Sequence, residues 1–226
     1  MGPRSRDLLS RLTSAALREE DFPFATSQEL DVAGATVRAT RMTYVGELGW
    51  ELLVRRDDAV TVFDALHEHG DDLGLADAGY SAIESLRLEK GYRAFGRELT
   101  PDYTPVEAGL VFATALNATK DFLGREALAA HRERLQAGGP RRRLVSLVVG
   151  DRDAMLWGGE LVLLDGRPVG QLMSAAYGAT VGASVGLAYL RHDGPVTSAW
   201  LGEGNFEVDV AGERHPVAVS LKAPLP

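Results

Sequence analysis

The C-terminal third of the chain constrains the fold most, because it consists of short apolar segments separated by glycine-containing turns such as Asp165-Gly166 and Ala211-Gly212. Several short strands at this spacing predict a small barrel or a sandwich. Five segments have the composition of strands: 144–149, 160–164, 169–174, 185–190 and 206–210.

The part of the chain before residue 138 mixes helical and strand patterns, so the sequence predicts an α+β fold. A hairpin is expected from Glu29 to Tyr44 around Ala33-Gly34, and a short strand at 109–116. The stretch from Gln136 to Pro140 is typical of a linker, which predicts one domain at 1–137 and a second at 138–226. Helices are expected at 5–17, 57–70, 79–90 and 124–135.

Finer features of these helices follow from capping and periodicity. Ser5 is placed as an N-cap of the first helix, and Gly70 as the stop of the second. Helical spacing predicts a buried stripe of Val60, Phe63 and Leu66 in the second helix, and Ile83 and Leu86 facing inward in the third. The turn-rich segment 91–105 is long for a loop, so we expect it to be functional or ordered by a partner.

The stretch Arg41–Val54 is typical of a β-hairpin, because Gly46 and Gly49 bracket Glu47-Leu48 between apolar and β-branched residues. A turn centred there would place Tyr44 directly opposite Glu51, so that both project from one face of the sheet. From these residues alone two interpretations stay open: a pair that contacts a ligand, or a solvated Glu51 beside a core Tyr44.

Composition excludes several classes of function. The net charge of −8 argues against nucleic-acid or anionic-membrane partners, which bind basic surfaces. Without cysteine there is no thiol catalysis, disulfide or thiolate metal site. The sequence contains no apolar run long enough to cross a membrane and no apolar signal core at its start, so a soluble, cytoplasmic protein is expected.

Common catalytic motifs are missing from the sequence. Of the histidines only His67 and His69 are close, and residues two apart do not share a helix face, so a metal site is not expected. There is no Gly-x-Ser-x-Gly elbow, and the glycines of 181–186 do not form a phosphate loop. The remaining candidates are polar residues in and after the expected hairpin: Tyr44, Glu47, Glu51, Arg87 and Glu89.

Four ordered segments carry a family resemblance. They are Tyr-Val-Gly-Glu-Leu-Gly-Trp-Glu at 44–51, Ser-Leu-Arg-Leu-Glu-Lys-Gly-Tyr-Arg at 85–93, Leu-Thr-Pro-Asp-Tyr-Thr-Pro-Val-Glu-Ala-Gly-Leu at 99–110 and Phe-Leu-Gly-Arg-Glu-Ala-Leu at 122–128. The chain resembles the glycine-cleavage T-protein (aminomethyltransferase) superfamily, and most closely the folate domains of dimethylglycine and sarcosine dehydrogenases. The resemblance implies a partial folate-binding domain, an antiparallel sheet with helices, followed by the family's C-terminal β-barrel.

The same resemblance implies a tetrahydrofolate site. The family's pterin contacts map to Tyr44 and Glu51, and the arginine that pairs with the folate tail maps to Arg87. A carboxylate suits the pterin edge, because it accepts two neighbouring N–H groups at once. Taken without the family, Arg87 is equally well a helix-surface ion pair with a neighbouring acid. Glu47 is interpreted as turn polarity.

One departure from the family affects the expected chemistry. In the family a further portion precedes the Gly-Pro-x-Ser-Arg segment and supplies the catalytic aspartate, whereas here that segment begins at Gly2. Asp7, Asp21 and Asp31 lie in the wrong context to replace this aspartate, and no flavin-binding segment is present. The catalytic residue is therefore left unassigned.

Three functional hypotheses remain. The first is a tetrahydrofolate-binding, aminomethyltransferase-like protein that transfers a one-carbon unit from an amine-derived donor. The second is a non-catalytic folate-binding or assembly module, completed by a partner chain that supplies the missing half or by a flavin amine dehydrogenase. The third is a folate-dependent demethylase. An incomplete domain would expose apolar surface, so association with itself or with a partner is expected.

Overall fold

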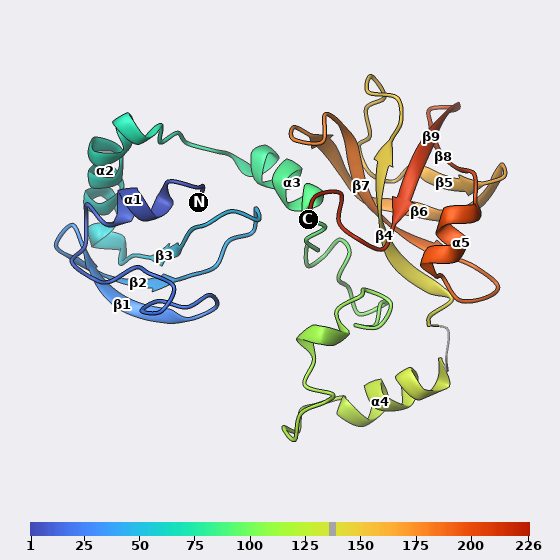
Figure 1. Ribbon diagram of the computed structural model, residues 1–226, viewed down its shortest axis with the longest axis horizontal. Helices are drawn as coiled ribbons and strands as arrows, with labels where there is room; N and C mark the ends of the chain where they lie inside the picture. Colours follow the sequence, from blue (N-terminus) through green and yellow to red (C-terminus); the bar gives the residue numbers. More distant parts are fainter. Residues whose placement is uncertain (136–138) are drawn as a thin grey trace. The chain divides into compact units, whose positions relative to one another are not determined.

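In the computed structural model, which describes residues 1–135 and 139–226, the chain forms two compact units. The first unit is Met1–Ile83 and the second is Glu84–Pro226 (Figure 1). The domain boundary expected near residue 138 lies outside the described residues. The mixed first part and the C-terminal barrel confirm the predicted α+β class.

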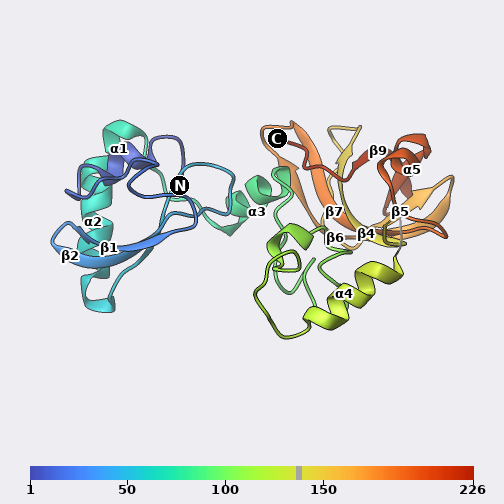
Figure 2. The same cartoon turned by 60° about the horizontal axis from the view of Figure 1, so that its bottom comes forward.

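The first unit is built on a three-stranded antiparallel sheet in the order β1-β2-β3. Strands β1 (Ser27–Val32) and β2 (Ala35–Thr40) are joined by Ala33-Gly34, both with positive φ, which confirms the predicted hairpin. The buried side chains of these strands alternate, and they face the helices on one side of the sheet (Figure 2). Strand β3 is Glu51–Leu53.

Helix α1 is only Ser5–Leu9, shorter than the predicted helix over 5–17. After Leu9 the chain continues in tight turns, and the carbonyl of Leu12 accepts a hydrogen bond from the backbone N–H of Ala33, in the β1–β2 turn. Ser5 is not the N-cap either, since its hydroxyl donates to the carbonyl of Leu48 at 3.0 Å. The apolar residues that suggested a longer helix, Leu12 and Leu17 included, are still buried.

Helix α2 (Ala59–Gly70) follows a 3₁₀ turn, η1 (Arg56–Asp58), and leads into a second one, η2 (Asp71–Leu73). It ends at Gly70 as predicted, but its predicted buried stripe is wrong. Val60 and Phe63 are 69% and 52% exposed, whereas Val62 is buried and Leu66 packs beside it. The helix carries apolar residues on two faces, and the sheet covers the face that contains Val62.

The second unit contains a closed six-stranded barrel in the order β4-β7-β6-β5-β8-β9 (Figure 1). All five predicted strands are present, and closure identifies the fold as a barrel and not a sandwich. Periodicity missed the last strand, β9, and a short helix, α5 (Ser198–Glu203). The strands are β4 (Arg142–Val149), β5 (Leu161–Leu164), β6 (Arg167–Gly178), β7 (Ala183–Arg191), β8 (Phe206–Val210) and β9 (Glu213–Ser220).

Helix α3 (Tyr80–Glu89) is anchored on the barrel by its last turn. Leu88 is fully buried in a cluster with apolar side chains on the outside of β4 and β7. The Glu89 carboxylate accepts hydrogen bonds from the backbone N–H groups of Thr180 and Val181, in the turn between β6 and β7. The predicted inward residues of α3, Ile83 and Leu86, are only half-buried.

Between α3 and the barrel, the predicted strand at 109–116 is wrong. These residues form turns and a short 3₁₀ helix, η3 (Val111–Ala113), and Phe112 is exposed. Among the described residues no strand pairs with this segment, so its apolar composition alone does not produce a strand. Helix α4 (Arg125–Arg134) confirms the helix predicted at 124–135.

No helix in the described part of the chain is long and apolar enough to span a membrane.

Candidate functional site

The stretch predicted as a tight hairpin is a ten-residue loop, 41–50, between β2 and β3. Glu51 pairs with Thr40 in the sheet, so the predicted register that placed Tyr44 opposite Glu51 is wrong. The physical reason is that the strand β2 ends at Thr40 and the segment 41–50 makes its own contacts instead of a ladder. Tyr44 lies in the loop, and Glu51 is the first residue of β3.

Several contacts hold the shape of loop 41–50. The Thr43 hydroxyl donates to the carbonyl of Glu47 at 2.7 Å, and the carbonyl of Leu48 accepts from the N–H of Gly2 at 2.8 Å. A Cβ atom at Gly49 would lie 2.8 Å from both Met1 Cα and Thr43 Cγ2, so only glycine fits there. The backbone of the loop is therefore held by contacts with the N-terminal residues and within the loop itself.

The side chains of Tyr44 and Glu51 are both exposed, Tyr44 at 37%. Glu51 forms no hydrogen bond through its carboxylate and no ion pair with any residue that the structure describes. An exposed carboxylate without an internal partner is able to accept hydrogen bonds from a ligand. Beneath the loop, Trp50 is buried and meets Phe22 edge to face, with ring centroids 6.1 Å apart.

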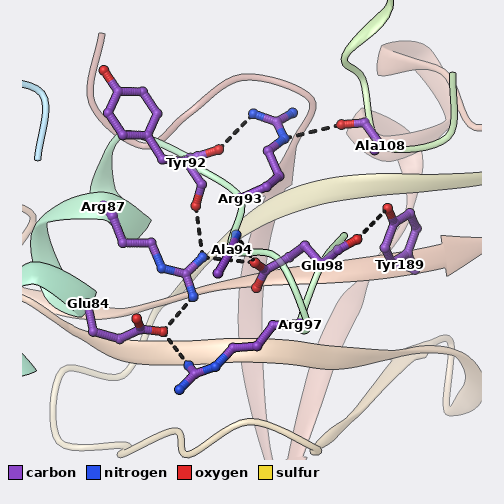
Figure 3. Close-up of polar contacts among 10 residues, drawn as sticks. Glu84, Arg87, Tyr92, Arg93, Ala94, Arg97, Glu98, Ala108 and Tyr189 are labelled. Atoms are coloured by element: carbon purple, nitrogen blue, oxygen red, sulfur yellow. Dashed lines mark hydrogen bonds and ion pairs between the residues drawn. The ribbon is translucent and has the colours of Figure 1, made fainter. Parts of the chain in front are cut away.

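Arg87, the third predicted site residue, lies in the second unit and is fully buried. Its guanidinium donates to the Glu98 carboxylate at 3.0 Å, to the carbonyl of Tyr92 at 2.8 Å and to Glu84 at 2.5 Å (Figure 3). It is therefore not the helix-surface pair that we considered from the sequence, and these contacts give it a role inside the fold. A contact with a folate tail stays a prediction for this residue.

Around Arg87, the segment that follows α3 is closed by buried polar contacts. Glu98 is fully buried, accepts from the backbone N–H of Ala94 at 2.7 Å, and offers its own carbonyl to the Tyr189 hydroxyl at 3.0 Å (Figure 3). Glu84 also pairs with Arg97, which is half-exposed. The result is a chain of alternating charges that runs from a buried carboxylate to a surface arginine.

Two buried groups beside this network have shifted pKa values. Burial lowers the pKa of Arg93, whose guanidinium donates to the carbonyls of Ala108 and Gly91. Burial also raises the pKa of the Tyr189 hydroxyl, so it stays protonated at neutral pH and serves as a hydrogen-bond donor. The first cause of both shifts is the loss of solvent around the group.

A second ion pair ties the segment before the barrel to β4. Arg142 contacts the Glu107 carboxylate at 2.8 Å and lies over the Tyr103 ring, which stacks on Tyr189 with centroids 3.7 Å apart. Burial alone raises the pKa of Glu107, but hydrogen bonds from Arg142 and Thr104 outweigh it and hold the pKa below its ordinary value. Glu107 is therefore ionised at neutral pH.

The sequence alone did not identify the acidic partners of Arg87 and Arg142. Glu84 stands three residues before Arg87 on one helix, a spacing that brings side chains together, so this pair had a visible signal. Glu98 and Glu107 lie in the turn-rich segment after α3, where no periodicity reports which face is buried. In the described ranges no three His, Cys, Asp or Glu side chains form a group that could hold a metal ion.

Comparisons with known proteins match the whole chain. The family model of the GCVT N-terminal domain matches residues 1–118, and that of the glycine cleavage T-protein C-terminal barrel domain matches residues 142–225. Mitochondrial sarcosine dehydrogenase of Mus musculus is 41% identical over 99% of this chain, and mitochondrial dimethylglycine dehydrogenase of Homo sapiens is 38% identical over 99%.

A solved structure shares the fold. The glycine cleavage system aminomethyltransferase T from Bartonella henselae superposes with a TM-score of 0.79 at 24% identity, over 99% of this chain and 57% of that one. The chain spans about a quarter of the length of the two dehydrogenases, 24% and 25%.

Proposed function

The chain belongs to the glycine cleavage T-protein family, and on that premise we propose that it binds tetrahydrofolate through Tyr44, in loop 41–50, and Glu51, at the start of β3. The family is the one that the sequence motifs predicted, and the two dehydrogenases named above come from the branch expected there. The observation that carries the proposal is Glu51, an exposed carboxylate with no partner among the described residues, at the end of a packed loop.

Bound tetrahydrofolate supplies a nucleophilic amine that captures a one-carbon unit from an amine-derived donor. The contribution of this chain is to hold and orient the pterin. Glu51 accepts two parallel hydrogen bonds from the N–H groups on the pterin edge. Tyr44, in the loop just before Glu51, contacts the same ligand. The described residues offer no assigned proton-transfer group, so the proposed role is binding and positioning.

A calorimetric titration of the whole chain with tetrahydrofolate tests the proposal. Glu51→Gln keeps the shape of the side chain but removes the charge that two donors share, so the dissociation constant should rise by ~10- to 100-fold. Glu47→Gln is the matched control, since it makes the same change at an exposed glutamate of loop 41–50, four residues before Glu51, and should bind like wild type. If wild type gives no binding heat, the assignment of tetrahydrofolate as the ligand is wrong. If Glu51→Gln binds as tightly as wild type, Glu51 does not contact the ligand.

A second candidate is an assembly module that binds folate but acts only with a partner chain, and large exposed apolar side chains in the first unit favour it. Those at least 40% exposed, besides Met1, are Phe24, Met42, Leu53, Val60, Phe63 and Tyr80. Apolar side chains exposed together typically mark interaction surfaces. Sedimentation velocity at micromolar concentration should then show self-association or binding to the partner, and a single monomeric species in both measurements would reject this candidate.

A further inference from the structure

Arginines gather at one end of the barrel because of how its strands run. Strands β4, β7 and β6 are antiparallel neighbours, so the start of β4, the end of β7 and the start of β6 lie at the same end. Those three positions are Arg142, Arg191 and Arg167. Together with Arg141 they line one groove of about 1200 Å³.

Three of these four arginines have no internal partner. Arg141, Arg167 and Arg191 are exposed, and none of them forms an ion pair or a side-chain hydrogen bond with a residue of the described ranges. Arg191 is also the direct cross-strand partner of Arg142. Like charges in opposite positions destabilise a sheet, and an anion bound beside them removes that cost.

One arginine of the groove, Arg142, already binds a carboxylate of the same chain, that of Glu107, which is not part of the groove lining. Arg142 binds both oxygens of Glu107, at 2.8 and 3.2 Å, while its guanidinium lies 4.6 Å from the centroid of the Tyr103 ring. This two-point geometry matches the fork of arginine to a carboxylate. Asp165 and Asp193 also line the groove, so its positive charge is interrupted. Such a surface suits separate carboxylates better than the continuous phosphates of a nucleic acid, which the net charge of −8 also repels.

The size and the walls of the groove favour an extended ligand. Its volume exceeds the ~300–1000 Å³ that is usual for small-molecule pockets. Apolar and aromatic side chains line it between the arginines, among them Leu161, Val169, Met173 and Trp200. We propose that this groove docks an extended acidic peptide segment of a partner protein, with carboxylates on Arg141, Arg167 and Arg191 and apolar side chains against the wall between them.

Fluorescence anisotropy with a labelled oligoglutamate peptide tests this proposal on the whole chain. We expect saturable binding that weakens with added salt, and no binding of the matched oligoglutamine peptide. Arg191→Glu and Arg167→Glu should each raise the dissociation constant by about tenfold or more. The matched control is Arg152→Glu, the same reversal at an exposed position just beyond β4, outside the groove. It should bind like wild type.

Three results overturn the proposal: no saturable binding of oligoglutamate by wild type, an equal loss of affinity in Arg152→Glu, or tighter binding of a single-stranded oligonucleotide than of the peptide. The variants alter exposed side chains, so circular dichroism should show no fall in the melting temperature of any of them. The measurement contains no folate, so its result is independent of the tetrahydrofolate proposal.

Discussion

Loop 41–50 and the segment 91–98 each contain glycine, tyrosine, arginine and glutamate. The carboxylates at their C-terminal ends, Glu51 just after the loop and Glu98 in the segment, nevertheless have opposite surroundings. Glu98 is fully buried and bonded to Arg87 and to the N–H of Ala94. Glu51, next to loop 41–50, is exposed and makes no internal contact through its carboxylate among the described residues. One carboxylate stabilises the fold, and the other is the ligand contact that we propose.

The largest expected effect comes from removing the buried carboxylate. Glu98→Ala leaves the buried Arg87 charge without its fully buried counterion, with only Glu84 still paired to it, which should lower the free energy of unfolding by about 3–5 kcal/mol. Urea denaturation followed by circular dichroism measures this loss. The double variant Arg87→Met/Glu98→Met removes both charges and should recover much of the stability. A loss below about 1 kcal/mol in Glu98→Ala would show that the pair does not hold this segment.

A smaller effect is expected in loop 41–50, where packing and not charge determines the shape. Gly49→Ala places a methyl group 2.8 Å from Met1 Cα and Thr43 Cγ2, and overpacking of this kind costs about 1–3 kcal/mol. Gly79→Ala is the control, since nothing lies within 4 Å of a methyl group there. If both variants unfold at the same urea concentration, loop 41–50 is not held by this contact.

In the second unit we also expect stability to depend on pH through Glu107. The pKa of Glu107 is held below its ordinary value of 4.5, so its ion pair stabilises the fold above that pH, and this contribution is lost as pH falls through the lower, folded-state value. The difference in stability between wild type and Glu107→Gln should therefore be present at neutral pH and shrink below about pH 4.5. A difference that stays constant down to pH 3 contradicts this assignment.

The smallest effect on stability is expected at the candidate ligand contact. Glu51→Ala removes an exposed carboxylate without internal partners, so the free energy of unfolding should change by no more than about 0.5 kcal/mol. The same chemical change at Glu98 is expected to cost several times more. A destabilisation of Glu51→Ala comparable with that of Glu98→Ala would mean that Glu51 also serves the fold.

Sequence patterns predicted the barrel strands well because these are short apolar segments separated by glycine-containing turns, which are local signals. The hairpin around Ala33-Gly34 succeeded for the same reason. The predicted pairing of Glu51 with Tyr44 was wrong because the length of β2 depends on which residues pair across the sheet. The prediction of the buried face of α2 failed because Val60 and Val62 are equally apolar, and only packing against the sheet determines which of the two is buried.

For the candidate site too, part could be predicted from local motifs and part depends on contacts between distant residues. Motifs identified Tyr44, Glu51 and Arg87 as a set, but the burial of Arg87 depends on Glu98, eleven residues later in an irregular segment. Charge partners across irregular segments leave no periodic trace, so a single sequence cannot distinguish an arginine that meets a ligand from one that holds a loop. Their joint contact with a folate therefore stays a prediction.

Closure of the barrel has a consequence for how the chain opens. Every barrel strand has a hydrogen-bonded neighbour on both sides, whereas β1 and β3 are edge strands of a three-stranded sheet. Amide protons of β4, β6 and β7 should therefore exchange with solvent only on global unfolding, while those on the outer edge of β1 exchange within local fluctuations. We therefore expect the unit that carries Tyr44 and Glu51 to undergo local opening while the barrel remains folded.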